Sequence, residues 1–589
     1  MPTHFHRCLL FVALTLGGRA VAAPEELPLT PSKPERPKLV LFIVVDQLRG
    51  DMPMRFYDRF GPDGLRRLLD EGAWYANAHY RHAATFTGTG HAALFTGAAV
   101  SEHGICGNRW LDRLTGEKVY CVEDSRCTLL GEPTKKRDGT SPANLLCSTI
   151  GDELVLATAG RSRVFAVGGK DRSAILPAGR LGKAFWFSTR SGRFVTSTYY
   201  ATEEPGWLRG FNDARPAEAY RNAKWELVED RSRYLFASAD DQACEYSAGT
   251  LGRTFPHTIS AADDPGFYDT LANTPMFDEL TVTFVEALLE ALRPGCGDAT
   301  DLLSVSLSAT DFIGHSFGPD SLEAEDNLIR LDRTIARLLA AVDKRVGLDR
   351  TLVVLSSDHG VDSSPEYRHA RYCASQPAAP RELQRLPGGA VQFRYDAERE
   401  AGALGTGRHY PQAFLGAINT ALRGEFHVDA DLAIGFANPS VYLDEPTILA
   451  KGLALEVVEH AAAEALLRLP GFAAVFTRSD LLAGRAPDTP IAKMMQRSFH
   501  PQRSGHLLLV QSPAWALYHD PTENTAMHGS PYAYDTHVPV VFRGPGVAAG
   551  RINRRVAPED IACTLALYLG VCSPSGSTGE PLLEALGGR

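Results

Sequence analysis

Short apolar runs rich in β-branched residues recur along this chain and constrain its fold more than any other feature. Six runs share this character: 38–45 (KLVLFIVV), 163–168, 302–307, 351–357, 506–510 and 538–542. Such runs are typical of strands buried on both faces of a sheet. Helical patterns lie between them, at 275–293, 321–344 and 453–468. This alternation predicts an α/β fold with a doubly wound, mostly parallel sheet and helices on both faces.

Two stretches interrupt the alternation. Residues 176–275 are rich in aromatic residues, Gly, Arg and Asp, and residues 366–500 contain mixed short elements. We expect both to be insertions over the sheet edge that bears the functional site. The length of 589 residues would otherwise suggest about four domains. With these insertions, residues 38–589 are predicted to form one large domain.

The N-terminus has the features of a secretory signal peptide, which we assign to residues 1–23. Arg7 precedes a short apolar stretch, and Ala20-Val21-Ala22 forms a cleavage motif, so cleavage is expected near Ala22/Ala23. The apolar stretch is about half the ~20 residues that a spanning helix needs. We therefore expect a secreted or periplasmic protein without a membrane anchor, whose residues 24–37 form an extended, proline-rich leader.

The cysteines and the charge limit the function further. Cys8 would leave with the signal peptide, and nine other cysteines would remain in an exported chain that can form disulfides. Cys121 and Cys127, and likewise Cys563 and Cys572, are close enough in sequence to pair, but spacing alone does not fix pairing. The net charge of −10 argues against a nucleic-acid binder, which needs a basic surface. An anionic substrate would need metals or local cations at its site.

Polar residues follow several of the apolar runs, where ligands bind in open α/β sheets. They are Asp46, the Asp311-x-x-x-His315 pair and Asp358-His359, and a later loop adds His528. Any one of them could be a helix cap, a surface pair or a turn residue. Together, carboxylates and imidazoles suit zinc or a similar divalent metal. The set fits two ions, one held by Asp311, His315 and His528 and the other by Asp46, Asp358 and His359.

A nucleophile for such a site lies in the segment 82–91 (HAATFTGTGH), which runs into a helical pattern. A hydroxyl at a helix N-terminus sits in a positive backbone field, although a threonine there can also be a simple cap. Metal coordination can activate an otherwise inert hydroxyl. Residues 88–93 also fit a relaxed dinucleotide-binding pattern, but no buried strand leads into them.

These motifs resemble the alkaline phosphatase superfamily, in particular the single-threonine branch shared by nucleotide pyrophosphatase/phosphodiesterases and PafA-type periplasmic alkaline phosphatases. The family's T-x-x-x-H segment matches Thr87 and His91, and its H-G-I-x-x-N stretch supplies Asn108. The metal motifs match in the same order, over roughly 38–365 and 500–545. The resemblance implies that Thr87 is the nucleophile and a metal ligand and that Asn108 contacts the phosphate.

The monoesterase branch of the superfamily carries a G-K-D-R segment, which here is Gly169-Lys170-Asp171-Arg172. A phosphate monoester has one more negative charge than a diester, and cations aimed at its free oxygens stabilise that charge. The resemblance implies that Lys170 and Arg172 hold these oxygens. It identifies an exported, metal-dependent phosphate monoester hydrolase that acts on small-molecule phosphate esters. A phospho-threonine intermediate and two divalent ions, with zinc as the expected metal, complete this expectation.

Other functions stay open at this point. A phosphodiesterase or nucleotide pyrophosphatase of the same superfamily would prefer diesters. A sulfatase would need a C-x-P-S-R segment, and Cys572-Ser573-Pro574-Ser575-Gly576 lacks the arginine. A non-enzymatic, metal-stabilised surface protein would bind metal without turnover. His91 and His537 are interpreted as supporting residues, and the aromatic residues of 185–211 could line the substrate entrance or pack in the core. The oligomeric state is not defined by the sequence.

Overall fold

The computed structural model describes residues 36–260, 264–375, 383–385, 391–393, 406–518 and 524–587. The predicted signal peptide therefore lies outside the described residues, as does most of the leader. Residues Arg36–Arg589 pack together as one compact unit. Their assignment to one domain with two insertions stays a prediction.

The centre of the structure is a ten-stranded sheet with the order β22-β2-β21-β12-β1-β11-β6-β7-β8-β5. In that order the strands are β22 (Gly550–Ile552), β2 (Ala73–His79), β21 (His537–Arg543), β12 (Thr351–Ser356), β1 (Leu39–Val45), β11 (Asp301–Leu307), β6 (Val164–Gly168), β7 (Lys183–Ser188), β8 (Arg193–Ser197) and β5 (Leu129–Leu130). The five strands from β12 to β7 are parallel, whereas β21, β8 and β5 pair antiparallel with their neighbours. The sheet is thus parallel in its middle and mixed at its margins.

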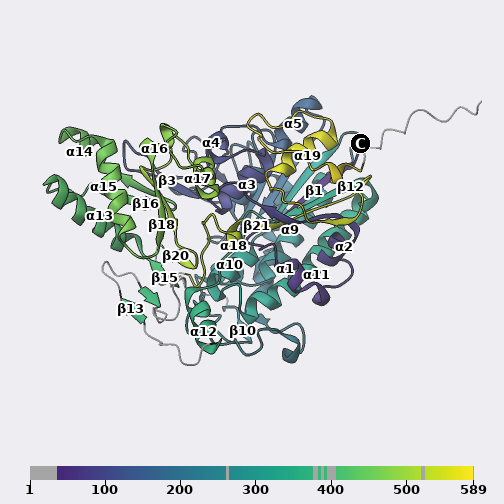
Figure 1. Ribbon diagram of the computed structural model, residues 1–589. Helices are drawn as coiled ribbons and strands as arrows, with labels where there is room; N and C mark the ends of the chain where they lie inside the picture. Colours follow the sequence, from purple (N-terminus) through teal and green to yellow (C-terminus); the bar gives the residue numbers. More distant parts are fainter. Residues whose placement is uncertain are drawn as a thin grey trace, which may run out of the picture. The chain divides into compact units, whose positions relative to one another are not determined.

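Helices cover both faces of this sheet (Figure 1). Leu41 and Ile43 of β1 point into one core, which contains side chains of α9 (Met276–Leu292) and α11 (Leu322–Arg345). Phe42 and Val44 point into the opposite core. That core contains side chains of α3 (Thr87–Thr96), α5 (Ile150–Ala157) and α19 (Asp560–Leu569). Since successive residues of one strand are buried on opposite faces, the structure confirms the predicted α/β fold.

The first predicted insertion, 176–275, is only partly outside the main sheet, because β7 and β8 extend that sheet. The residues after β8 pack over one face and include α7 (Gly206–Asp213) and α8 (Phe267–Ala272). The aromatic rings of this region stack on one another, as Phe194 does on Phe284, with ring centroids 4.0 Å apart. Phe185, Phe187 and Phe194 are buried in the core, so they do not line a substrate entrance.

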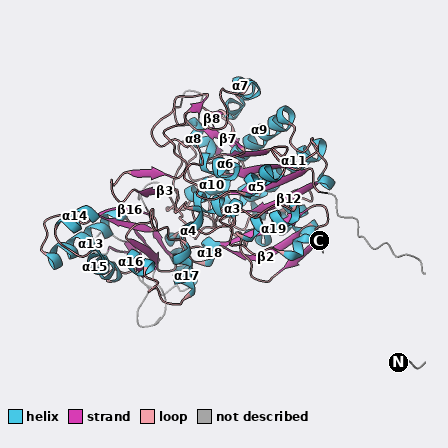
Figure 2. Cartoon of the chain, turned by 90° about the horizontal axis from the view of Figure 1, so that it is seen from above, coloured by secondary structure: helices cyan, strands magenta, loops and turns pink. Residues whose placement is uncertain are grey.

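The second predicted insertion, 366–500, contributes to a separate four-stranded sheet of order β16-β17-β19-β18, which lies beside the main sheet in Figure 2. Its strands are β16 (Ala433–Ala437), β17 (Ser440–Leu443), β19 (Leu507–Gln511) and β18 (Phe472–Thr477). The apolar run 506–510 thus forms a strand of this second sheet. Helices α13 (Pro411–Phe426) and α15 (Leu455–Leu467) close a core of its own.

The other elements are shorter or connect these layers. The helices are α1 (Met52–Arg55), α2 (Leu65–Glu71), α4 (Val100–His103), α6 (Asp171–Ala178), α10 (Ala309–Phe317), α12 (Pro365–Ser375), α14 (Glu445–Ala450), α16 (Arg478–Leu482), α17 (Pro490–Arg497) and α18 (Ala533–Thr536). The strands are β3 (Arg109–Leu111), β4 (Lys118–Tyr120), β9 (Lys224–Trp225), β10 (His257–Thr258), β13 (Leu383–Arg385), β14 (Val391–Phe393), β15 (Thr406–His409) and β20 (Trp515–Leu517).

Two further expectations concern cysteines and membrane segments. Cys121, Cys127, Cys563 and Cys572 are all free thiols, so neither of the two close pairs is bridged. Among the described residues, no helix combines the length and the apolar character that crossing a membrane requires.

Packing of α3 against β1 offers a test of the fold. Phe42 is fully buried, and its ring stacks on Phe95 of α3 with centroids 4.5 Å apart. We expect Phe42→Ala to lower the free energy of unfolding by about 3–5 kcal/mol, because it removes buried ring area and leaves a cavity. Urea unfolding followed by circular dichroism measures this loss. Leu114→Ala is the control, since Leu114 is 79% exposed and should cost less than about 0.5 kcal/mol.

Candidate active site

The predicted site residues meet at the carboxyl edge of four adjacent parallel strands. Asp46 follows β1, Asp358 follows β12 and Lys170 follows β6, while Asp311 lies in the first turn of α10 after β11. The register explains this meeting: Val45 pairs with Leu307, and Val44 pairs with Ser356. The residues that leave these strands therefore emerge at the same level.

One group of ligand atoms comes from Asp46, Asp358 and His359. Nε2 of His359 lies 3.5 Å from Oδ1 of Asp46 and 3.6 Å from Oδ2 of Asp358. Both Nε2 of His359 and Oδ1 of Asp46 are buried and make no hydrogen bond within the described part of the chain. Buried polar atoms are nearly always paired, so these two atoms fit the role of ligands to one cation.

A second group surrounds Asp311. Nε2 of His315 lies 3.3 Å from Oδ1 of Asp311, and Nε2 of His528 lies 3.8 Å from the same oxygen. The rings of His528 and His359 stack with centroids 3.6 Å apart, so the two groups adjoin. His359 is close enough to Asp311 and His528 to be a ligand in either group.

The three imidazoles are oriented by backbone carbonyls. Nδ1 of His315 donates to Ala526 O (2.8 Å), Nδ1 of His528 to Thr85 O (2.7 Å) and Nδ1 of His359 to Gly360 O (3.0 Å). A carbonyl can only accept, so each Nδ1 is the donor, and each Nε2 is turned toward a carboxylate of Asp311 or Asp46. This arrangement is typical of histidines that bind a metal.

The charges of the buried groups are strongly perturbed. Burial, together with the carboxylates of Asp311 and Asp358, raises the pKa of Asp46 well above its usual value. Burial lowers the pKa of His528 and of His359, which favours neutral imidazoles. Burial would also raise the pKa of Asp311, but the Lys170 ammonium and His315 hold it well below its ordinary value.

Lys170 occupies the centre of the carboxylates. Its Nζ lies 2.6 Å from Oδ2 of Asp46 and also donates to Oδ2 of Asp311. Burial would lower the pKa of Lys170, but the carboxylates of Asp311 and Asp46 outweigh burial and raise it. The ammonium of Lys170 thus partly neutralises the carboxylates of both ligand groups, because it binds Asp46 of one group and Asp311 of the other.

Thr87 is the first residue of α3, and its side chain is buried. A Cβ on Gly90 would come within 2.1 Å of Asp358 O, so the first turn of α3 reaches the site only because residue 90 has no side chain. His91 fixes this turn, with its Nδ1 2.9 Å from Thr87 O and 3.2 Å from Oδ2 of Asp358. Asn108 also binds the turn, since its Oδ1 accepts the Gly88 N–H at 2.7 Å.

Arg172 and Asn108 line a cavity of about 410 Å³ together with His315 and His528. The guanidinium of Arg172 donates to the hydroxyl of Tyr120 at 3.3 Å, and Tyr120 donates to Asp171. Burial disfavours the charged guanidinium, but Tyr120 and Asp171 raise the pKa of Arg172 and keep the charge. A fixed, half-buried cation therefore lines the same cavity as two of the imidazoles.

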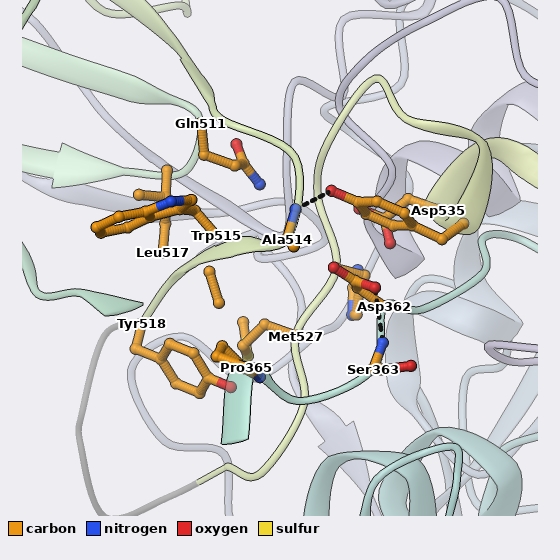
Figure 3. Close-up of a pocket in the computed structure, with 13 residues that line it drawn as sticks. Asp362, Ser363, Pro365, Gln511, Ala514, Trp515, Leu517, Tyr518, Met527 and Asp535 are labelled. Atoms are coloured by element: carbon orange, nitrogen blue, oxygen red, sulfur yellow. Dashed lines mark hydrogen bonds between the residues drawn. The ribbon is translucent and has the colours of Figure 1, made fainter. Parts of the chain in front are cut away.

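Two separate regions form much of the remaining wall of this cavity, together with Phe86, Asn524 and Met527. The β3–β4 hairpin contributes Trp110 and Lys118, and the segment 436–438 at the end of β16 contributes Phe436 and Asn438. A much smaller cavity of about 10 Å³ is lined by His528, Asp362 and Asp535 among others. Figure 3 shows this cavity and labels Asp362 and Asp535. The volume of this cavity is of the order that holds a single water molecule, so the larger cavity is the one that can admit a phosphate ester.

Sequence reasoning missed three contributors to the site. Gln47 donates to Oδ1 of Asp311 (2.7 Å) through its amide and to Oδ1 of Asp358 (3.1 Å) through its backbone N–H. The position of Gln47 directly after the candidate ligand Asp46 indicates that it lies at the site. Tyr120 and Asn438 had no comparable signal, because both reach the cavity only through tertiary packing.

The interpreted supporting histidines have structural partners. His91 lies between Thr87 and Asp358, and its Nε2 is 3.0 Å from Ser306 Oγ. His537 donates from Nε2 to Ala76 O and stacks on His79, away from the ligand groups.

Comparison with known proteins agrees with this geometry. The family model for type I phosphodiesterase / nucleotide pyrophosphatase matches residues 40–531. A protein of Myroides odoratus named calcium-transporting ATPase is 34% identical over 571 residues, covering 96% of each chain. The alkaline phosphatase PafA of Elizabethkingia meningoseptica is 33% identical over 558 residues, covering 94% of this chain and 95% of that protein. A crystal structure of PafA matches with a TM-score of 0.82 over 94% of this chain and 99% of the other, at 31% identity.

The chain therefore belongs to the type I phosphodiesterase / nucleotide pyrophosphatase family of phosphoesterases. Within the alkaline phosphatase superfamily it is of the PafA type, as the likeness over nearly the whole length of both chains shows.

Proposed function

We propose that this protein is an exported phosphate monoester hydrolase, an alkaline phosphatase, that uses two divalent metal ions and a phospho-threonine intermediate. The observation that carries this proposal is the cavity in which Arg172 and Asn108 face the same space as His315 and His528. Export rests on the signal-like residues 1–23, with a secreted or periplasmic location.

The residues fit two ions of the zinc type. Three carboxylates and three imidazoles gather at the strand ends, where Oδ1 of Asp46, Oδ2 of Asp358 and Nε2 of His359 are buried and lack hydrogen-bond partners among the described residues. We assign Asp311, His315 and His528 to one ion, and Asp46, Thr87, Asp358 and His359 to the other. The ions would supply Lewis-acid stabilisation of the attacking and leaving oxygens of a displacement at phosphorus.

The chain's own groups then perform the remaining tasks. Thr87 attacks phosphorus from the N-terminus of α3, where the helix dipole favours an alkoxide; the bond between phosphorus and the ester oxygen breaks, and the alcohol leaves with a proton. Asn108 donates from its amide nitrogen to a phosphoryl oxygen, because its Oδ1 is already occupied by the Gly88 N–H. Arg172 binds the free oxygens of the monoester. Lys170 offsets charge between Asp46 and Asp311, and we assign its ammonium a contact with the same phosphoryl group. Water then hydrolyses the phospho-threonine and releases phosphate.

The guanidinium distinguishes a monoesterase from a diesterase. We expect Arg172→Ala to lower kcat/KM for an aryl phosphate monoester about 10²–10³-fold, since one preorganised donor to the developing charge is lost. Turnover of a bis-aryl phosphate diester should fall less than about tenfold, because a diester has one negative charge fewer. Steady-state kinetics with both substrates give the ratio of monoester to diester kcat/KM in the wild type and in Arg172→Ala.

The control for this experiment is Arg126→Ala. Arg126 is exposed and pairs with Asp124 outside the cavity, so both rates should stay unchanged. An equal loss on the two substrates in Arg172→Ala, or a wild-type enzyme that prefers the diester, contradicts the monoesterase assignment and favours the phosphodiesterase.

A further inference from the structure

The segment 524–528 connects two of the candidate metal ligands and is held from two sides. It ends in His528, and its Ala526 O accepts the Nδ1 proton of His315 at 2.8 Å. Any shift of this segment therefore moves one imidazole directly and releases the orientation of the other. Both imidazoles face Oδ1 of Asp311.

Thr525 caps the end of α10, the helix that carries Asp311 and His315. The last carbonyls of a helix have no partner within the helix. The Thr525 N–H donates to His315 O at 2.6 Å, and the Thr525 hydroxyl lies 2.6 Å from Ser316 O. The same hydroxyl lies 2.8 Å from Cys244 O and accepts the Tyr246 N–H at 2.8 Å. Thr525 is 1% exposed, so water cannot replace these bonds.

Arg408 of β15 fixes the same segment from the side of the second predicted insertion. Its guanidinium donates to Asn524 O (3.3 Å) and to Thr525 O (3.1 Å). Glu366 accepts the Nε proton of Arg408 at 2.6 Å, and the ring of Tyr518 lies 4.2 Å below the guanidinium. The Tyr518 hydroxyl also donates to Thr525 O, at 2.7 Å. The planar guanidinium of Arg408, held by the Glu366 carboxylate and the Tyr518 ring, has little freedom to move.

We infer that Thr525 and Arg408 are positioning residues for one metal ion only, the ion assigned to Asp311, His315 and His528. Through Arg408, packing of the second predicted insertion then controls how tightly that ion is held. The other ligands, Asp46, Asp358 and His359, follow β1 and β12 of the main sheet, and Nδ1 of His359 is held by Gly360 O and not by a carbonyl of this segment. This inference rests on the proposed two-metal function.

Zinc titration of the metal-free, full-length protein against a competing chelator tests the inference. In the wild type we expect two zinc equivalents. Thr525→Val keeps the shape of the side chain and the backbone N–H but removes the hydroxyl. It should weaken one equivalent about 10–100-fold, the usual effect of losing a bond behind a metal ligand, and leave the other unchanged. Thr525→Ser, which keeps the hydroxyl, should stay near the wild type.

Two further variants define the effect. Asp311→Ala removes a ligand of the ion assigned to Asp311, His315 and His528, so the zinc equivalent that it loses is the one bound there. The same equivalent should bind more weakly in Thr525→Val. Arg408→Lys keeps the charge but loses the forked guanidinium, and we expect it to weaken binding of that zinc equivalent as well.

Excess zinc should restore kcat in Thr525→Val, because positioning affects occupancy of the metal site and not the chemical step. Thr281→Val is the matched control, since the Thr281 hydroxyl is also buried but donates to Phe277 O within α9.

Loss of both equivalents together, or of neither, in folded Thr525→Val would overturn the inference. Circular dichroism establishes folding, and if Val at position 525 prevents it, Arg408→Lys decides by the same criterion. A wild-type protein that binds no zinc overturns the proposed function and this inference with it. The two failures are distinguishable, because failure of the proposed function is already seen in the zinc titration of the wild type, whereas failure of this inference is seen only in the variants.

Discussion

Thr87→Ala should reduce phosphomonoester turnover by at least about 10⁴-fold while the protein stays folded, since removal of a covalent nucleophile leaves only binding and electrostatic effects. Thr87 is the first residue of α3, and Nδ1 of His91 lies between Thr87 O and Oδ2 of Asp358. Alanine at the first turn of a helix is well tolerated. Steady-state kinetics at high enzyme concentration, with circular dichroism for the fold, measure both parts of the expectation.

The matched control is Thr96→Ala, at the other end of the same helix. The Thr96 hydroxyl is buried and donates to Ala92 O at 2.6 Å, so its removal tests the loss of a threonine hydroxyl from α3 without touching the cavity. Turnover should stay within about threefold of the wild type, a rate factor worth less than about 1 kcal/mol. A phosphorylated residue other than Thr87 after rapid quenching with substrate, or substantial activity in Thr87→Ala, would sink the nucleophile assignment.

The sequence predicted the parts of this fold that depend on local pattern. The run 38–45 is apolar because β1 is buried on both faces, and Asp46 breaks the run because the strand ends there. The i, i+4 spacing places Asp311 and His315 on one face of α10, where Nε2 and Oδ1 lie 3.3 Å apart. Periodicity and strand ends together thus predicted Asp46, Asp311 and His315 as candidate ligands without any tertiary information.

Other parts depend on contacts between residues far apart in the chain, and local pattern holds no signal for them. The run 506–510 reads as a buried strand, but its apolar character fits either sheet, and pairing with β17 and β18 decides the outcome. β7 and β8 were assigned to an insertion because their aromatic composition differs from the β-branched runs. The carbonyls that orient the imidazoles are backbone atoms of Thr85 and Ala526, and side-chain identity does not reveal them.

Part of the chain's acidic composition lies in three carboxylates at the candidate site. Asp46, Asp311 and Asp358 are all buried, and one ammonium from Lys170 cannot neutralise three carboxylates. Burying unpaired charge is costly, so the metal-free site is electrostatically incomplete. The imbalance is what two dications would correct, and they would leave the cavity positive enough for a phosphate dianion.

Removal of metal should therefore abolish activity without unfolding the protein. We expect exhaustive chelation to lower phosphomonoester turnover at least about 10³-fold, since metal ions supply several kcal/mol of charge stabilisation and each ~1.4 kcal/mol is a factor of ten in rate. Lys170 still pairs with Asp46 and Asp311 in the metal-free protein, which should keep the strand ends together. Activity and far-ultraviolet circular dichroism before and after chelation measure the two effects.

Restoring single metals identifies the ion, and ligand variants separate the two sites. Zinc should recover activity better than magnesium, because imidazole nitrogen mixed with carboxylate suits zinc and magnesium prefers oxygen. Asp358→Ala and Asp311→Ala should each lose one zinc equivalent by elemental analysis and keep the other. Arg172→Ala serves as the control that loses rate but retains both equivalents, because its guanidinium binds Tyr120 and no ligand carboxylate. Activity that survives exhaustive chelation, or two equivalents retained in Asp311→Ala, is incompatible with a two-metal mechanism in which the buried carboxylates hold the ions.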